Sequence, residues 1–164
     1  MIFLTSCERK SGRKNGLRNP NKGQYENNRQ SPNNSSAKTR IKMENQNGVK
    51  YVWIEINGLR LKFIFDTGAS NICISVAEAT VLYRQGTLKK EDILNVQYFQ
   101  DATGNISEGT LINLRTVKVG ERILKNIEAI VIDNDSAPLL LGQSALEKFG
   151  KISIDNRNNE IIFE

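Results

Sequence analysis

Histidine is absent from this chain of 164 residues, and cysteine occurs only twice. Without histidine the chain cannot build a Ser-His-Asp triad or a Cys-His pair, and most kinds of zinc site are excluded too. Cys7 and Cys73 match no metal or redox spacing, and Cys73, inside the apolar run NICIS, is expected to be a small buried hydrophobe. No stretch approaches the roughly 20 apolar residues of a membrane span. We expect no metal and no cofactor.

The excess of positive charge is confined to the front of the chain. Residues 1–46 hold 10 Lys and Arg against 3 Asp and Glu, whereas residues 47–164 hold 13 against 15. Residues 8–46 contain almost no apolar side chains, so they cannot bury enough surface to offset the entropy of ordering. We predict that residues 1–46 form a disordered basic tether before one domain at 47–164. Because Tyr25 is the sole aromatic residue in 8–46, we expect no nucleic-acid partner.

The first seven residues, MIFLTSC, resemble a bacterial lipoprotein signal, in which Leu4-Thr5-Ser6-Cys7 would make Cys7 the lipidated residue. Such a signal also needs a charged start and an apolar stretch of about 7–15 residues, which are missing or truncated here. Two locations therefore stay open. If the true start lies upstream, the protein is a lipoprotein of the cell envelope with a membrane tether through Cys7; otherwise it is cytoplasmic.

Residues 47–164 predict a mainly-β domain. Residues 49–56 and 59–65 are β-rich and are separated by Asn57-Gly58, a strong hairpin signal because both positions tolerate a positive φ. The second strand of this hairpin delivers Asp66 at its end. The rest of the domain reads as strands with turns at 103–105, 108–109 and 125–126, a short strand at 139–142 and a final hairpin over 151–164.

One medium and one or two short helices complete the predicted domain. Ser75 and Glu78 have the spacing of a capping box, and Gly86 is placed to end the helix that they start. A second short helix is expected within 89–95. Ser144 and Glu147 repeat the capping-box spacing for a third helix, over 144–149.

The stretch FIFDTGAS, residues 63–70, places a carboxylate directly after a buried strand. A carboxylate is costly to desolvate unless it is hydrogen-bonded or its pKa moves. Asp66 is therefore either an ordinary turn residue in water or a tuned group at a reaction centre. Asp-Thr-Gly alone is weak evidence, so the surrounding sequence has to decide.

Several separated blocks around this motif, covering residues 49–164, resemble the retroviral-type (retropepsin-like) aspartic proteases, in their cellular and bacterial branch with one Asp-Thr-Gly per chain. The order of the blocks makes the match specific. They are VWIEINGLRLKFIFDTGAS, ISVAEATVLYRQGTLKKEDIL, DATGN, TVKVGERILKNIEAIVID, LLLGQSALEKFG and ISIDNRNNEIIF.

The resemblance implies a retropepsin-like fold and an aspartic endopeptidase that cleaves polypeptides. Because the chain has one such motif, it also implies a homodimer in which the two Asp66 carboxylates meet on the two-fold axis and activate a water molecule. Gly68 would let the backbone approach without a Cβ clash, and Ala69 belongs to the same supporting loop. Thr67 would brace the two loops against each other, and Ser70 would orient the carboxylate.

The segment 98–112 would be the flap, a hairpin that folds over the substrate. Within it, Ala102, Thr103, Gly104 and Asn105 are expected near the substrate. After LLLG, viral members usually carry a basic residue and then Asp or Asn for dimer contacts, whereas this chain has Gln143 and Ser144. A dimer contact through the C-terminal segment 160–164 is one alternative.

A non-catalytic peptide-binding or dimerisation module on the same fold is the competing interpretation, because a fold alone does not fix function. The intact Asp-Thr-Gly-Ala-Ser argues for catalysis.

Overall fold

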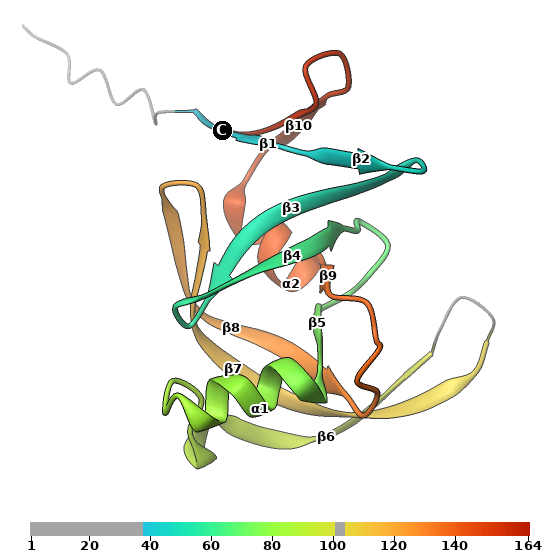
Figure 1. Ribbon diagram of the computed structural model, residues 1–164, viewed down its shortest axis with the longest axis vertical. Helices are drawn as coiled ribbons and strands as arrows, with labels where there is room; N and C mark the ends of the chain where they lie inside the picture. The colour runs from blue at the N-terminus through green and yellow to red at the C-terminus, as the bar shows by residue number, and fades with distance from the viewer. Residues whose placement is uncertain (1–37, 101–103) are drawn as a thin grey trace, which may run out of the picture. The chain divides into compact units, whose positions relative to one another are not determined.

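The computed structural model describes residues 38–100 and 104–164 and contains two β-sheets, three short helical turns and one longer helix (Figure 1). One sheet has the strand order β1-β11-β10, and the other has the order β2-β3-β4-β9-β5-β8-β7-β6. The predicted mainly-β class is confirmed. The strands are β1 (Thr39–Lys42), β2 (Glu44–Gln46), β3 (Val49–Ile56), β4 (Leu59–Phe65), β5 (Ile72–Ser75), β6 (Ile93–Gln100), β7 (Ile106–Val119), β8 (Arg122–Ile132), β9 (Leu140–Leu141), β10 (Ile152–Asp155) and β11 (Glu160–Phe163). The helical elements are α1 (Val76–Arg84), η1 (Lys90–Asp92), α2 (Gln143–Leu146) and η2 (Glu147–Phe149).

The hairpin of β3 and β4 forms where Asn57-Gly58 predicts it. Ile56 pairs with Leu59 across the turn, and Asn57 and Gly58 have φ of 46° and 87°. The Asn57 side chain also forms hydrogen bonds outside the turn. Its Nδ2 donates to Thr87 O at 3.0 Å, and its Oδ1 accepts from Thr116 N at 3.0 Å. The buried amide thus ties the hairpin to two other segments of the domain.

A continuous hydrophobic core joins the inner faces of the strands with the helices. On β3 the buried residues alternate, as period-two patterning requires for a strand with one face on a core. The largest fully buried side chains are Ile54, Ile56, Phe63, Ile72, Ile74, Leu82, Ile112, Leu114, Ile127, Leu141, Leu146 and Phe163.

The predicted tether reaches too far into the chain, because residues 39–46 form β1 and β2. Strand β1 pairs with β11, with Ile41 opposite Ile161. Ile41 packs against the core, and Met43 is 5% exposed. The composition of residues 39–46 could not indicate that β1 forms, because its partner strand β11 lies more than a hundred residues away in the sequence. Residues 1–37, including Cys7 and the lipoprotein-like segment, lie outside the described residues.

Two predicted turns are absent from the described strands β7 and β8, which run unbroken through 108–109 and 125–126. Gly109 is needed for close packing: a Cβ there would lie 2.5 Å from Ile130 Cγ2 on β8. Asn126 has a φ of 55° yet stays within β8. Gly109 and Asn126, although typical of turns, therefore lie inside strands, where one allows close packing and the other a local irregularity.

Helix α1 starts with the predicted capping box. Ala77 N donates to Ser75 Oγ at 3.1 Å, and Ser75 N donates to Glu78 Oε2 at 3.2 Å. Gly86, with a φ of 71°, follows the helix as expected. The second predicted helix is shorter than 89–95 and consists of the single turn η1. In the part of the chain that the structure describes, no helix is both long enough and apolar enough to span a membrane.

An ion pair anchors η1 to β7 at the base of the β6–β7 hairpin. Asp92 is 4% exposed, and Arg115 Nε donates to its Oδ1 at 2.9 Å. Burial raises the pKa of Asp92, but hydrogen bonds from Arg115 and from the Lys89 N–H lower it by more, so that its pKa lies below the usual value. The carboxylate therefore stays ionised, and its ion pair with Arg115 persists, at pH values where free aspartate begins to protonate.

Strand β11 is the middle strand of the smaller sheet, between β1 and β10. Both of its edges are already paired within the chain, so a partner strand cannot add to it. A dimer contact through residues 160–164 therefore stays a prediction, and it would have to use side chains of β11, since both of its strand edges are occupied by β1 and β10. At its end, hydrogen bonds from Lys151 and Lys38 lower the pKa of Glu164 to about 2.

Candidate active site

Asp66 stands at the carboxyl end of β4, where the chain leaves the sheet. Strand β4 runs parallel to β9, with Phe65 opposite Leu141, and Asp66 N donates to Leu141 O at 3.2 Å. The apolar residues before Asp66 place its backbone at the edge of the core. The small residues after it make the turn that returns the chain to β5.

The Asp66 carboxylate is held by its own turn. Gly68 N donates to Asp66 Oδ1 at 2.8 Å, and a Cβ on Gly68 would lie 3.2 Å from that oxygen. Asp66 is half-buried, whereas Thr67 and Gly68 are exposed. One carboxylate oxygen is therefore fixed by the backbone, on a loop whose tip faces solvent in the single chain.

The segment after β9 packs tightly against this loop. A Cβ on Gly142 would lie 2.2 Å from Asn71 O and 2.7 Å from Ala69 O, so no larger residue fits without moving the backbone. Gln143 N donates to Ala69 O at 2.9 Å, and Ser144 N donates to Ser70 O at 2.8 Å. The predicted strand LLLG thus ends in direct contact with the Asp-Thr-Gly loop.

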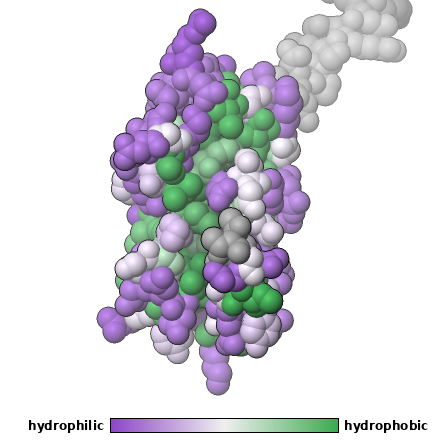
Figure 2. Space-filling view, turned by 90° about the vertical axis from the view of Figure 1, so that its right-hand side faces the viewer, coloured by the Kyte–Doolittle hydropathy of each residue, from purple (hydrophilic) through white to green (hydrophobic). Residues whose placement is uncertain are grey.

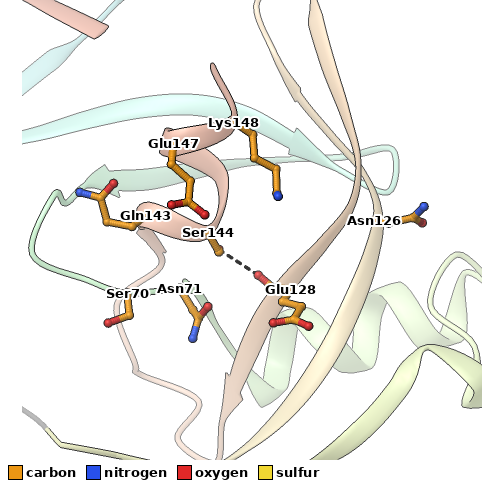
Figure 3. Close-up of a pocket in the computed structure, with 8 residues that line it drawn as sticks. All are labelled: Ser70, Asn71, Asn126, Glu128, Gln143, Ser144, Glu147 and Lys148. Atoms are coloured by element: carbon orange, nitrogen blue, oxygen red, sulfur yellow. Dashed lines mark hydrogen bonds between the residues drawn. The ribbon is translucent and has the colours of Figure 1, made fainter. Parts of the chain in front are cut away.

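Ser144 is not the helix cap that its spacing predicts. The N-cap of α2 is Gly142. The Ser144 hydroxyl accepts a hydrogen bond from Ile72 N at 3.0 Å and donates to Glu128 O at 3.0 Å (Figure 3). The hydroxyl therefore links the start of β5 to β8 instead of closing the helix end. Gly150, with a φ of 79°, ends the helical segment as predicted.

Asp66 opens into a cavity of about 580 Å³ between its loop and the β6–β7 hairpin. Asp66 is the one acidic residue among the described residues that line it. The apolar side of the cavity comes from Ile130, Ile132 and Leu140, and the loop contributes Gly68, Ala69, Ser70, Asn71 and Cys73.

The hairpin supplies Gln97, Tyr98, Phe99 and Gln100 to this cavity. The predicted flap segment 98–112 contains three of these residues and begins just after Gln97. None of the four was named as a substrate contact, because the alternation of a strand does not say which face meets the loop. Gly104 and Asn105 lie at the start of the returning arm and do not line the cavity; Gln100 Nε2 donates to Gly104 O at 3.0 Å. Ala102 and Thr103 lie outside the described residues.

Residues 52–148 match the family described as "gag-polyprotein putative aspartyl protease". The chain belongs to this aspartyl protease family. A search of curated proteins finds no match. Among solved structures, the chain is similar to a retropepsin-like aspartic protease from Rickettsia conorii, with 28% identity and a TM-score of 0.59 over 77% of this chain and 98% of that one. The retropepsin-like fold that the sequence indicated is confirmed, and family and fold together support an aspartic protease.

A broad hydrophobic strip crosses one face of this protease domain. Figure 2 shows it running down the middle of the face on the side to which β6 and β7 extend in Figure 1, between hydrophilic regions. On the hairpin itself, Val96, Tyr98 and Ile106 are 53%, 68% and 72% exposed. Large exposed apolar patches of this kind often mark surfaces that a partner or a ligand covers.

A second cavity, of about 480 Å³ and lined by polar residues, lies beside the Asp66 loop (Figure 3). It shares Ser70 and Asn71 with the Asp66 cavity, so these two residues form a common wall. Its other lining residues are Asn126, Glu128, Gln143, Ser144, Glu147 and Lys148. Within residues 38–100 and 104–164, no group of three or more potential ligands is placed to hold a metal ion.

Cys73 lines the Asp66 cavity and is only partly buried, whereas its run predicts a small buried hydrophobe. Burial, and secondarily the charge of Asp66, raise the pKa of its thiol to about 11. The thiolate is the nucleophile, so at pH 8 alkylation should be about a thousandfold slower than for a fully ionised thiol. In a Cys7→Ser background, Asp66→Asn should speed alkylation by iodoacetamide, since removing the negative charge lowers the thiol pKa.

The rate of Cys73 alkylation would be followed by intact-mass spectrometry between pH 7 and pH 10. Asp133→Asn, an exposed carboxylate outside the cavity, is the matched control and should leave the rate unchanged. Equal rates in the Asp66 and Asp133 variants would show that the Asp66 charge does not reach the thiol.

Proposed function

We propose that this protein is an aspartic endopeptidase that works as a homodimer, with one Asp66 from each subunit. The observation that carries the proposal is the solitary carboxylate. Asp66 is held in a substrate-sized cavity, and the described lining of that cavity offers no second acid. The family hydrolyses peptide bonds with aspartate, and a second copy of the chain is the simplest source of the partner group.

Two carboxylates about 3 Å apart cannot both ionise, so they share one proton. The ionised member of the pair takes a proton from a water molecule, which attacks the peptide carbonyl, while the protonated member donates to the carbonyl oxygen. By symmetry either Asp66 can take either role, and the pair titrates as a unit. Collapse of the tetrahedral intermediate, with a proton passed to the leaving nitrogen, releases the two products.

The loop residues have supporting roles in this proposal. Gly68 N–H fixes one carboxylate oxygen of Asp66 at 2.8 Å and leaves the other for water or substrate. Thr67 is exposed at the tip of the loop and would meet its counterpart on the partner subunit. Ser70 lines the cavity as a candidate to orient the carboxylate, although within the described chain its hydroxyl makes no hydrogen bond to Asp66.

The β6–β7 hairpin would act as the flap. Tyr98 and its neighbours border the Asp66 cavity, and the tip with Gly104 and Asn105 extends beyond it. An extended polypeptide between the hairpin and the catalytic loop would be shielded from water and offered backbone partners by both. The exposed apolar residues of the hairpin would then be covered by substrate or by the second subunit.

The proposal predicts that specific activity depends on protein concentration. Well below the dissociation constant of the dimer, each doubling of concentration should about double the activity per subunit, because only dimers carry a complete site. Initial rates on an unfolded protein substrate would be measured from nanomolar to tens of micromolar enzyme, alongside sedimentation velocity. Constant specific activity in a range where sedimentation shows monomer would contradict the dimeric site.

A further inference from the structure

Three hydrogen bonds join the beginning of α2 to the loop that carries Asp66. Two of them use the backbone N–H groups of Gln143 and Ser144. The third comes from a side-chain amide: Gln143 Nε2 donates to Thr67 O at 3.0 Å. It reaches further toward the catalytic group than the others do, because Thr67 directly follows Asp66.

The Thr67 carbonyl belongs to the same peptide group as the Gly68 N–H. That N–H donates to Asp66 Oδ1 at 2.8 Å. A peptide group is planar and rigid, with its C=O and N–H pointing in opposite directions. The peptide group between Thr67 and Gly68 therefore accepts a hydrogen bond from Gln143 through its C=O and donates one to the Asp66 carboxylate through its N–H.

We propose that Gln143 is a positioning residue for Asp66, acting through the peptide group that joins Thr67 to Gly68. The inference rests on the proposed function for its catalytic consequence, but the geometry concerns the loop alone. In the single chain Thr67 and Gly68 are exposed, so hydrogen bonds and not packing within the subunit restrain their peptide group. Gln143 also lines the polar cavity, but Figure 3 shows its side chain leaving α2 on the side away from Glu128.

The chemistry at this position requires a donor. The Thr67 carbonyl oxygen can only accept, and a glutamine amide donates without bringing charge close to the Asp66 pair. A hydrogen bond donated to the Thr67 oxygen also polarises the peptide group, which strengthens the hydrogen bond from Gly68 N–H to the Asp66 carboxylate. A side chain of the same shape without a donor would leave the peptide group free to tilt and would allow the carboxylate to rotate.

Gln143→Glu tests this with one nearly isosteric exchange. The ionised carboxylate that it introduces cannot donate and repels the Thr67 oxygen, so kcat should fall about tenfold while KM and the dimer dissociation constant stay within about twofold. As the pH falls through about 4.3, the usual glutamic acid value, the introduced carboxyl gains a proton that it can donate. The ratio of variant to native kcat should therefore rise toward one at low pH.

Charged groups around position 143 can move that midpoint. Glu147 and Lys148 follow on the next turn, Glu128 faces them from β8, and Asp66 lies beyond the loop. Gln143→Met, which has a similar length and no donor at any pH, should be impaired at every pH. Gln85→Glu, the same exchange at the exposed C-cap of α1, is the matched control and should leave the kcat profile unchanged.

A readout without substrate separates this inference from the proposed function. In uniformly ¹⁵N-labelled protein, Gln143→Met should shift the Gly68 amide resonance and speed its hydrogen exchange by about tenfold, since its peptide group loses its restraint. If the native protein proved inactive but Gln143→Met still shifted the Gly68 amide resonance and sped its exchange, the proposed function would be contradicted and the positioning role of Gln143 in the loop would be supported. An unchanged Gly68 amide, or a loss of dimer in place of a loss of kcat, would overturn the inference.

Discussion

Replacing Asp66 with Asn is expected to lower kcat for peptide hydrolysis by at least about 10⁴-fold, a loss typical of removing a member of a catalytic constellation. Asparagine has the shape of aspartate, and its side-chain oxygen can still accept the bond from Gly68 N. It cannot take a proton from water, however, and cannot share one with the opposite carboxylate. The fold and the dimer should survive, because the exchange alters neither volume nor packing.

This prediction would be checked with steady-state kinetics on a peptide library, with circular dichroism and sedimentation to confirm the fold and the dimer. Asp133→Asn and Asp135→Asn remove exposed carboxylates from the turn after β8 and serve as controls with native activity. Hydrolysis by the Asp66 variant at more than about a tenth of the native rate would place the chemistry elsewhere.

Replacing Gly142 with Ala is expected to lower the free energy of unfolding by about 3 kcal/mol, at the upper end for overpacking, because the obstacle is backbone. The added Cβ would lie 2.2 Å from Asn71 O. The φ of Gly142 is −100°, so the backbone conformation itself suits alanine and the whole cost is steric. To admit the methyl group, α2 and the Asp66 loop would have to separate, and activity should be lost with the stability.

Gly48→Ala is the contrasting control. At Gly48 nothing lies within 4 Å of the added Cβ, but its φ of 85° disfavours alanine. The expected cost there is about 1 kcal/mol, from backbone strain alone, with catalysis unaffected. Urea unfolding would measure both variants. If Gly142→Ala proved no more costly than Gly48→Ala, the tight contact between α2 and the Asp66 loop would be refuted.

The features that sequence predicted well are those that neighbouring residues determine. The Asn57-Gly58 hairpin and the Ser75 capping box are set within a few residues, and both are confirmed. The family was indicated by several ordered blocks, of which Asp-Thr-Gly is the most characteristic, and the comparisons confirm it.

The features that sequence missed depend on contacts between distant segments. Strand β1 exists because β11 pairs with it, although the residues around it look like a tether. Gly109 was taken for a turn because the nearby side chain of Ile130 is invisible in a local pattern. Ser144 was expected to cap a helix, but its hydroxyl is engaged by Ile72 and Glu128. The bond from Gln143 to Thr67 bridges 76 positions and had no local signal.

Mixing native protein with the Asp66→Asn variant tests the shared site most directly. After subunit exchange at a fixed total concentration, well above the dimer dissociation constant, only dimers of two native chains should cleave peptides. An equal mixture should then show about one quarter of the activity of native protein alone, since random pairing makes about one dimer in four fully native. Activity of about one half, falling linearly with the fraction of variant, would mean that each chain works with its own acid and would contradict the dimeric site.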